Sequence, residues 1–208
     1  MRVDIGCADR ESAEKLVAIG DCAVFETAFE EFGDGMIKSK AIDDRFGCAL
    51  MVDLIRSELE YDTYFAFTTC EEVGCDGSRE VCHQIQPDVA IVLESTTAGD
   101  IGTVPDERCA CRVRSGAVIS HMDNGTIYDK QLVQLALDIG KEKEIPCQLK
   151  NLVAGGNDAR SFQTGAAGAR VLAISAPTRY IHSASNVVAK DDLISVGRLV
   201  KSILERNI

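Results

Sequence analysis

Short apolar runs with β character alternate along the chain with amphipathic helical stretches. The clearest apolar runs are continuous rather than alternating, which is typical of strands buried on both faces, and they are YFAFTT (64–69), VAIVLE (89–94) and RVLAISA (170–176). Helices are predicted around them at 43–59, 78–86, 129–143, 158–163 and 191–206. This order predicts the α/β fold class, with a mixed, mostly parallel sheet flanked by helices.

The rest of the chain carries weaker signals. At the N-terminal end we expect strands over 3–5 and 22–29, with a helix between them that Asp9 caps and Gly20 ends. GAVIS (116–120) and LKNLVA (149–154) predict two further strands, and turn residues dominate the segment 95–124.

Composition excludes several classes of protein. A formal net charge of -11 disfavours a nucleic acid as partner, because such binding depends on clustered Lys and Arg. No apolar stretch reaches the roughly 20 residues of a membrane span, and the first residues lack a signal-peptide pattern. The 9 cysteines are an odd number without a Cys-x-x-Cys pair, which indicates reduced thiols. We therefore expect a cytoplasmic protein without nucleic-acid or membrane partners.

Polar residues that follow apolar strands are the first candidates for chemistry, because ligands of α/β sheets collect at the carboxyl ends of strands. Four places qualify: Asp43 and Asp44 in AIDDRFG, Glu71 and Glu72 in TTCEEVG, Glu94 in IVLEST, and His182 in PTRYIHS. Taken singly, these acids could cap helices or be solvated, and the histidine could be structural. Together, such carboxylates would repel one another and raise one another's pKa values unless cations neutralised them.

The two adjacent glutamates suggest a division of labour. Neighbouring residues at a strand end point in different directions, so one glutamate can bind a metal ion while the other faces a substrate. A carboxylate base beside a water molecule activated by a cation gives hydrolysis without a nucleophilic side chain. The sequence contains no Gly-x-Ser-x-Gly elbow, Walker loop or dinucleotide fingerprint that would offer a competing mechanism.

The strings AIDDRFG, TTCEEVG, VLESTTAGD, GGNDA and PTRYIHS stand in this order along the chain. In this series the chain resembles the tetrahedral-type dinuclear metallo-aminopeptidases, a zinc-peptidase-like family that includes glutamyl aminopeptidases and proteins once labelled cellulase M. The resemblance implies hydrolysis of N-terminal residues from short peptides and assembly into a homo-oligomer. It also implies a cis peptide between Asp43 and Asp44.

The resemblance implies a role for each site residue. Asp43 would bridge two divalent metal ions (zinc, cobalt or manganese), Glu72 and His182 would hold one of them, and Glu94 the other. Glu71 would be the catalytic base, and Asp44 would support the ligands from behind. Three further residues would line the substrate pocket: Asp158, Arg179 and Tyr180.

The chain departs from the family at its N-terminal end. The resemblance covers only the C-terminal portion of the family pattern, so 1–32 is expected to be the end of a small β-rich assembly domain and 33–208 an incomplete catalytic domain. The family's His-x-Asp segment is absent, and neither His83 nor His121 matches it, so one metal site lacks its imidazole. An impaired chain that binds metal or associates with a complementary fragment therefore stays an alternative, as does deacylation of a non-peptide amide.

Overall fold

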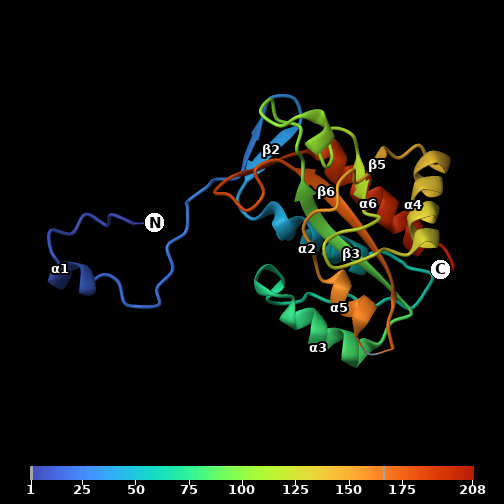
Figure 1. Ribbon diagram of the computed structural model, residues 1–208, viewed down its shortest axis with the longest axis horizontal. Helices are drawn as coiled ribbons and strands as arrows, with labels where there is room; N and C mark the ends of the chain where they lie inside the picture. The colour runs from blue at the N-terminus through green and yellow to red at the C-terminus, as the bar shows by residue number, and fades with distance from the viewer. Residues whose placement is uncertain (1, 166) are drawn as a thin grey trace.

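The computed structural model describes residues 2–165 and 167–208, and its centre is a sheet of four strands in the order β3-β6-β4-β5 (Figure 1). β3 (Val89–Thr97) pairs in parallel with β6 (Arg170–Thr178) over the full length of both strands. β4 (Ala117–Ile119) is antiparallel to β6 and parallel to β5 (Cys147–Leu149). The mixed, mostly parallel α/β sheet predicted from the sequence is confirmed.

A second, antiparallel sheet of three short strands lies beside the first. β1 (Glu30–Phe32) pairs with β2 (Met36–Ser39), and β2 pairs with β7 (Asn186–Ala189). None of β1, β2 and β7 was predicted from the sequence, and the strand that was predicted nearby, at 22–29, ends just before β1. This sheet holds the start of α2 near β7, since the Ile42 amide donates to the Asn186 side chain.

Helices pack around the sheets at the places where amphipathic stretches were predicted, with ends shifted by a few residues. α2, α4 and α6 lie against the sheet and one another, and α3 and α5 contact each other next to β3 and β6 (Figure 1). Asp129 caps α4 through the amides of Gln131 and Leu132. The helix bounds are α1 Arg10–Glu14, α2 Ile42–Ile55, α3 Asp76–Ile85, α4 Lys130–Glu142, α5 Ala159–Thr164 and α6 Lys190–Leu204, with 3₁₀ turns at η1 Glu71–Val73 and η2 Asp106–Arg108. None of the described helices is both long and apolar enough to span a membrane.

The predicted strand at 64–69 is wrong in the described structure. The segment is extended, but it forms no strand ladder with any described residue, and Tyr64 and Phe67 are exposed. Its apolar run is typical of a strand, but a strand needs a hydrogen-bonded neighbour, and β3 lies alongside without pairing to it. The predicted strands at 3–5 and 22–29 are likewise unpaired, and the strand predicted at 149–154 begins earlier, as β5.

Residues 2–29 form an arm that leaves the folded body (Figure 1). α1 has the capping box that Asp9 predicted, with the Asp9 side chain accepting from the Ser12 amide, but no residue of this helix is buried. Thr27 anchors the end of the arm by donating its hydroxyl hydrogen to the Ala184 carbonyl. The core therefore lies elsewhere, between the main sheet and its helices, where the side chains of β6 from Val171 to Thr178 are buried.

Candidate metal centre

The start of α2 positions two aspartates at the edge of the main sheet. Asp43 and Asp44 have non-helical backbone angles at the first turn, and the peptide bond between them is cis, as the sequence analysis predicted. The Asp43 carboxylate turns toward β3, where its Oδ1 accepts from the Ser95 amide at 3.4 Å. The helix thus begins with one carboxylate directed at the neighbouring strand.

Asp43, Glu72 and His182 converge from three separate parts of the chain. Nε2 of His182 lies 3.2 Å from Oδ2 of Asp43 and 3.3 Å from Oε2 of Glu72. One ligand atom from each of the three residues lies within 4.8 Å of the others, and no other such group of three His, Cys, Asp or Glu side chains occurs among the described residues. The Asp43 side chain is 10% exposed, whereas His182 and Glu72 are 65% and 55% exposed, so the cluster opens to solvent.

The backbone around this cluster adopts unusual conformations. Among the described residues, eight that are not glycine have positive φ, and five of these stand within two residues of the predicted site or in its loops: Ala41, Cys70, Cys75, Tyr180 and His182. L-residues adopt this region at a cost, and such residues concentrate where the surrounding fold holds side chains in required positions. The backbone of the loops that carry Glu72 and His182 therefore holds these two side chains in defined positions.

Asp44 turns away from the cluster and packs against its own helix. Its Oδ1 accepts from the Gly47 amide at 3.0 Å, and a Cβ on Gly47 would lie only 2.1 Å from Oδ2 of Asp44. Burial, together with the charges of Asp43, Glu71 and Glu72, raises the pKa of Asp44 to about 8, although the hydrogen bond from the Gly47 amide acts in the opposite direction. Gly47 is therefore the residue that leaves room for this buried carboxyl group.

Glu71 lies beside Glu72 in η1 but in different surroundings. It is half-buried, its Oε1 is 3.9 Å from the Cys75 thiol, and burial followed by the charge of Asp158 raises its pKa to about 7. The charges of Glu72 and Asp43 act in the same direction. A carboxyl group with a pKa near neutrality can both accept and release a proton at working pH.

Glu94 differs from its predicted position. It was expected to end its strand, but β3 continues to Thr97, so Glu94 lies inside the strand. Burial raises its pKa well above the ordinary value, and the charges of Asp44, Glu71 and Asp43 add to this effect. Glu94 is close enough to share the electrostatics of the cluster, but it is not part of the three-residue group.

The three residues predicted to line a substrate pocket take different positions. Asp158 is buried, and its Oδ2 accepts from the Thr68 hydroxyl at 2.5 Å, while its Oδ1 has no hydrogen-bond partner in the described part of the chain. Arg179 forms a two-pronged pair with Asp100 at 2.8 and 2.7 Å, and Tyr180 is 54% exposed. No sequence pattern points to Thr68 or Asp100, because a partner 90 or 79 positions away in the chain leaves no local pattern.

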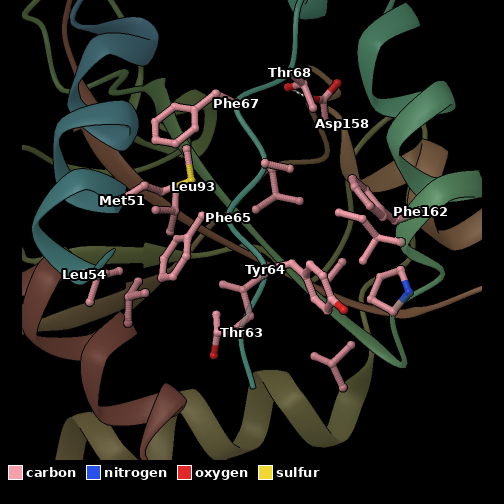
Figure 2. Close-up of a pocket in the computed structure, with 18 of the residues that line it drawn as sticks. Met51, Leu54, Thr63, Tyr64, Phe65, Phe67, Thr68, Leu93, Asp158 and Phe162 are labelled. Atoms are coloured by element: carbon pink, nitrogen blue, oxygen red, sulfur yellow. Dashed lines mark hydrogen bonds between the residues drawn. The ribbon is translucent and has the colours of Figure 1, made fainter. Parts of the chain in front are cut away.

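A cavity of about 820 Å³ adjoins the cluster. The acids of the cluster are among its lining residues, and Figure 2 shows Asp158 with Thr68 at one end, while the rest of the segment 63–68 runs through the apolar part. Figure 2 shows Phe65 and Phe67 on the side of Met51 and Leu54, and Phe162 on the other side of the segment. The site thus combines an acidic end with a long apolar interior.

Comparison with known proteins identifies relatives of the whole arrangement. The sequence model of the M42 glutamyl aminopeptidase family matches residues 1–199. A putative aminopeptidase of Acetivibrio thermocellus is 36% identical over 202 residues, which cover 96% of this chain and 60% of that protein.

Solved structures agree with this match. An aminopeptidase from the archaeon Desulfurococcus kamchatkensis superposes with a TM-score of 0.92 at 33% identity, covering 98% of this chain and 59% of that one. The TET1 peptidase of Pyrococcus horikoshii, which can assemble into a tetrahedron or a large octahedral shell, has a TM-score of 0.82 at 29% identity, with coverage of 98% and 60%. The chain spans about three fifths of the length of these relatives.

Proposed function

This chain belongs to the M42 glutamyl aminopeptidase family, and on that premise we propose that its acidic cluster serves metal-dependent removal of N-terminal residues from short peptides. The observation that carries the proposal is the convergence of Asp43, Glu72 and His182, with Glu71 next to them. These residues come from α2, η1 and the loop after β6, so packing of the helices and sheet brings them together rather than local sequence.

The donor set suits a divalent cation. Two carboxylates and one imidazole are ligands that zinc, cobalt and manganese accept, and the three ligand atoms already lie within reach of one ion. Burial, and after it the repulsion between neighbouring carboxylates, raises the pKa values of Asp43, Glu71 and Glu94, and a bound cation would offset both effects. When bound, the ion would supply Lewis-acid activation of water and of the scissile carbonyl.

Glu71 is the base in this proposal. It is not in the ligand group, it is half-buried, and its surroundings bring its pKa to about 7. Glu71 would take a proton from the attacking water and give it to the leaving amine. Asp44 follows Asp43 in the chain and accepts a hydrogen bond from the Gly47 amide. In this position it would restrict the movement of the Asp43 carboxylate, which is the metal ligand.

A second cation would need Glu94 together with Asp43. Among the described residues these two have no third ligand group, since His83 and His121 are exposed on other parts of the fold. This observation favours a second candidate function, in which the chain binds one ion and does not by itself catalyse. The two candidates share the Asp43, Glu72 and His182 site and differ in turnover.

Substrate contacts are proposed for the loops beside the cluster. Asp158 lies next to Glu71, Tyr180 is exposed within two residues of His182, and Arg179 is held by Asp100. These positions would contact the peptide near its N-terminal residue, with Arg179 shaping the wall through its pair. We propose reduced cysteines and a cytoplasmic location, in keeping with the nine free thiols.

We propose that the chain forms a homo-oligomer. The arm exposes apolar side chains that nothing in the described chain covers, including Val24, Phe25 and Phe29. We propose that 1–32 is the end of the assembly part and 33–208 the catalytic part, and the arm lies within the first of these ranges. The TET1 relative assembles into closed shells, and this chain's arm would supply contacts for an assembly of its own.

Glu71→Gln tests the proposed chemistry. We expect the variant to lose hydrolysis of aminoacyl p-nitroanilides by at least about 100-fold, because the amide cannot accept the proton, while divalent-metal content stays unchanged. Glu80→Gln, on the exposed side of α3, is the matched control and should retain activity. An active Glu71→Gln variant would remove Glu71 from the mechanism, and an inactive but metal-loaded wild type would favour the second candidate.

A further inference from the structure

The side chain of Asn186 connects two segments of the chain that carry predicted metal ligands. Asn186 is the first residue of β7 and is 1% exposed, so its amide group lies in the interior. Its Oδ1 accepts from the Ile42 amide at 3.1 Å, and its Nδ2 donates to the Tyr180 carbonyl at 2.8 Å. Ile42 directly precedes Asp43, and Tyr180 lies two residues before His182. One buried side chain therefore bonds to both segments.

At the first segment, Asn186 caps α2 from outside the helix. The first amides of a helix have no partner within it, and a side-chain oxygen of the preceding residue usually satisfies one of them. Here the preceding residue is Ala41, which has no side-chain oxygen and lies in the left-handed region with a φ of 51°. Asn186 supplies the acceptor from β7. It therefore holds the backbone from which the Asp43 side chain extends.

At the second segment, Asn186 holds the loop that carries His182. Backbone hydrogen bonds of 2.9 and 3.0 Å between the residue after β6 and the second residue of β7 close this loop at its base. Inside the loop, Tyr180 and His182 both have a φ of 57°, a region that L-residues adopt at a cost. The Tyr180 carbonyl accepts from Asn186 and also from the Ser183 hydroxyl, at 2.6 Å. These two donors keep the backbone before His182 in its left-handed conformation.

The two hydrogen bonds of Asn186 require a side chain that both accepts and donates. Ile42 offers a hydrogen atom, whereas Tyr180 offers a carbonyl oxygen. An amide has an acceptor and a donor on one rigid plane, whereas an ionised carboxylate only accepts and an aliphatic side chain does neither. Loss of the amide would leave two buried backbone groups without partners, which is unfavourable enough to make both segments shift.

We propose that Asn186 is a positioning residue of the metal site, whose buried amide fixes the Asp43 segment relative to the His182 loop. This arrangement keeps Nε2 of His182 close to Oδ2 of Asp43, at 3.2 Å. Asn186 acts through these two ligands and does not itself bind the ion. The proposal rests on the proposed function, because the role it gives to Asn186 is a role in that metal site.

Cobalt binding to the full chain tests this role. Asn186→Leu nearly keeps the size of the side chain and removes both hydrogen bonds. Asp192→Leu is the matched control, since Asp192 is also 1% exposed and accepts from the amides of Arg114 and Gly116, neither of which is adjacent to a predicted ligand. Both variants should lower the unfolding midpoint.

The affinity for Co²⁺ separates a positioning role from a merely structural one. Residues that orient metal ligands typically change metal affinity by about 10- to 100-fold when they are replaced. Asn186→Leu should therefore weaken the binding of Co²⁺ by at least about 10-fold and alter the visible absorption of the bound ion, which reports the geometry of its ligands. Asp192→Leu should keep the affinity and the absorption spectrum of the wild type.

Hydrogen exchange in the wild type, followed by NMR, decides the question if Asn186→Leu does not fold. The side-chain amide hydrogens of Asn186 should exchange at least about 10-fold more slowly than those of the exposed Asn207. Loading with Zn²⁺ should slow the exchange of Asn186 further, because a side chain that favours metal binding is stabilised by the metal in return. Exchange of Asn186 that Zn²⁺ leaves unchanged would overturn the proposal.

The outcomes distinguish this proposal from the proposed function. A wild type that binds no Co²⁺ would overturn the metal site, and the role of Asn186 with it. If the wild type binds Co²⁺ but Asn186→Leu binds it equally tightly, the metal site stands and Asn186 has no positioning role. An equal loss of affinity in Asp192→Leu would also overturn the proposal, because general destabilisation would then explain both variants.

Discussion

His182 and Glu72 approach each other within 3.3 Å although both side chains are more than half exposed. Exposed groups of this kind ordinarily gain little from a surface pair, because water screens them and ordering long side chains costs entropy. Here the ordering comes from the backbone, since His182 has positive φ and Glu72 lies in a tight 3₁₀ turn. At the scale of single residues, loop geometry positions the side chains of Glu72 and His182, and Asp43 is the least exposed of the three residues.

The pair of Asp100 and Arg179 is expected to matter for stability at the same scale. Burial raises the pKa of Asp100, but hydrogen bonds from Arg179 and the Val113 amide lower it more, so its pKa lies below the ordinary value. Asp100→Asn should lower the free energy of unfolding by about 1.5 kcal/mol, because it removes the charged partner of the half-buried Arg179 guanidinium. Denaturant unfolding at pH 7 measures this.

The pH dependence of that difference checks its cause. A depressed carboxyl pKa stabilises the fold above the unfolded-state pKa of about 4, and the stabilisation is lost as the pH falls below it. The gap between the wild type and Asp100→Asn should therefore shrink under acid. Asp106→Asn, which breaks an exposed pair with Arg112, should leave the unfolding midpoint unchanged. An equal loss in both variants would contradict the account.

At the scale of elements, the sequence predicts a helix or strand well where the element's partners lie within the same fold. The helices around 129–143 and 191–206 have long amphipathic patterns, Asp129 caps the first of them, and both form. The segment 64–69 has an equally clear strand pattern, but its apolar side chains face a void where no described strand pairs with it. The candidate site residues could be predicted from short sequence motifs. The pairs of Asp158 with Thr68 and of Arg179 with Asp100 could not, because they depend on tertiary contacts.

Gly116 controls how β4 enters the sheet. Its φ is +86°, and a Cβ there would lie 2.0 Å from the carbonyl oxygen of Pro146, the residue directly before β5. Gly116→Ala should destabilise the protein by on the order of 3 kcal/mol, through backbone strain and a clash with another main-chain segment. Gly102→Ala, where a Cβ meets open space, should change stability by less than about 0.5 kcal/mol. Thermal unfolding measures the midpoints of the two variants, and equal midpoints would contradict this prediction.

At the scale of the whole molecule, the arm and the body are separable. α1 and the residues around it bury no side chain, so deleting residues 2–20 should leave the unfolding midpoint of the body unchanged. The same deletion removes Leu16, Val17 and Ile19 from the exposed apolar surface and should reduce self-association. Sedimentation velocity at several concentrations measures the second effect. A destabilised body, or an oligomer that persists unchanged, would show that the arm has another role.

The most direct test of the account is the metal content of the chain and of one variant. After loading with zinc, cobalt or manganese and removal of free ions by gel filtration, elemental analysis should find one ion per wild-type chain. His182→Ala should lose that ion, and His83→Ala, on the exposed side of α3, should keep it. A wild type that holds no ion, or a His182→Ala variant that holds as much as the wild type, would contradict the claim that Asp43, Glu72 and His182 form a metal site.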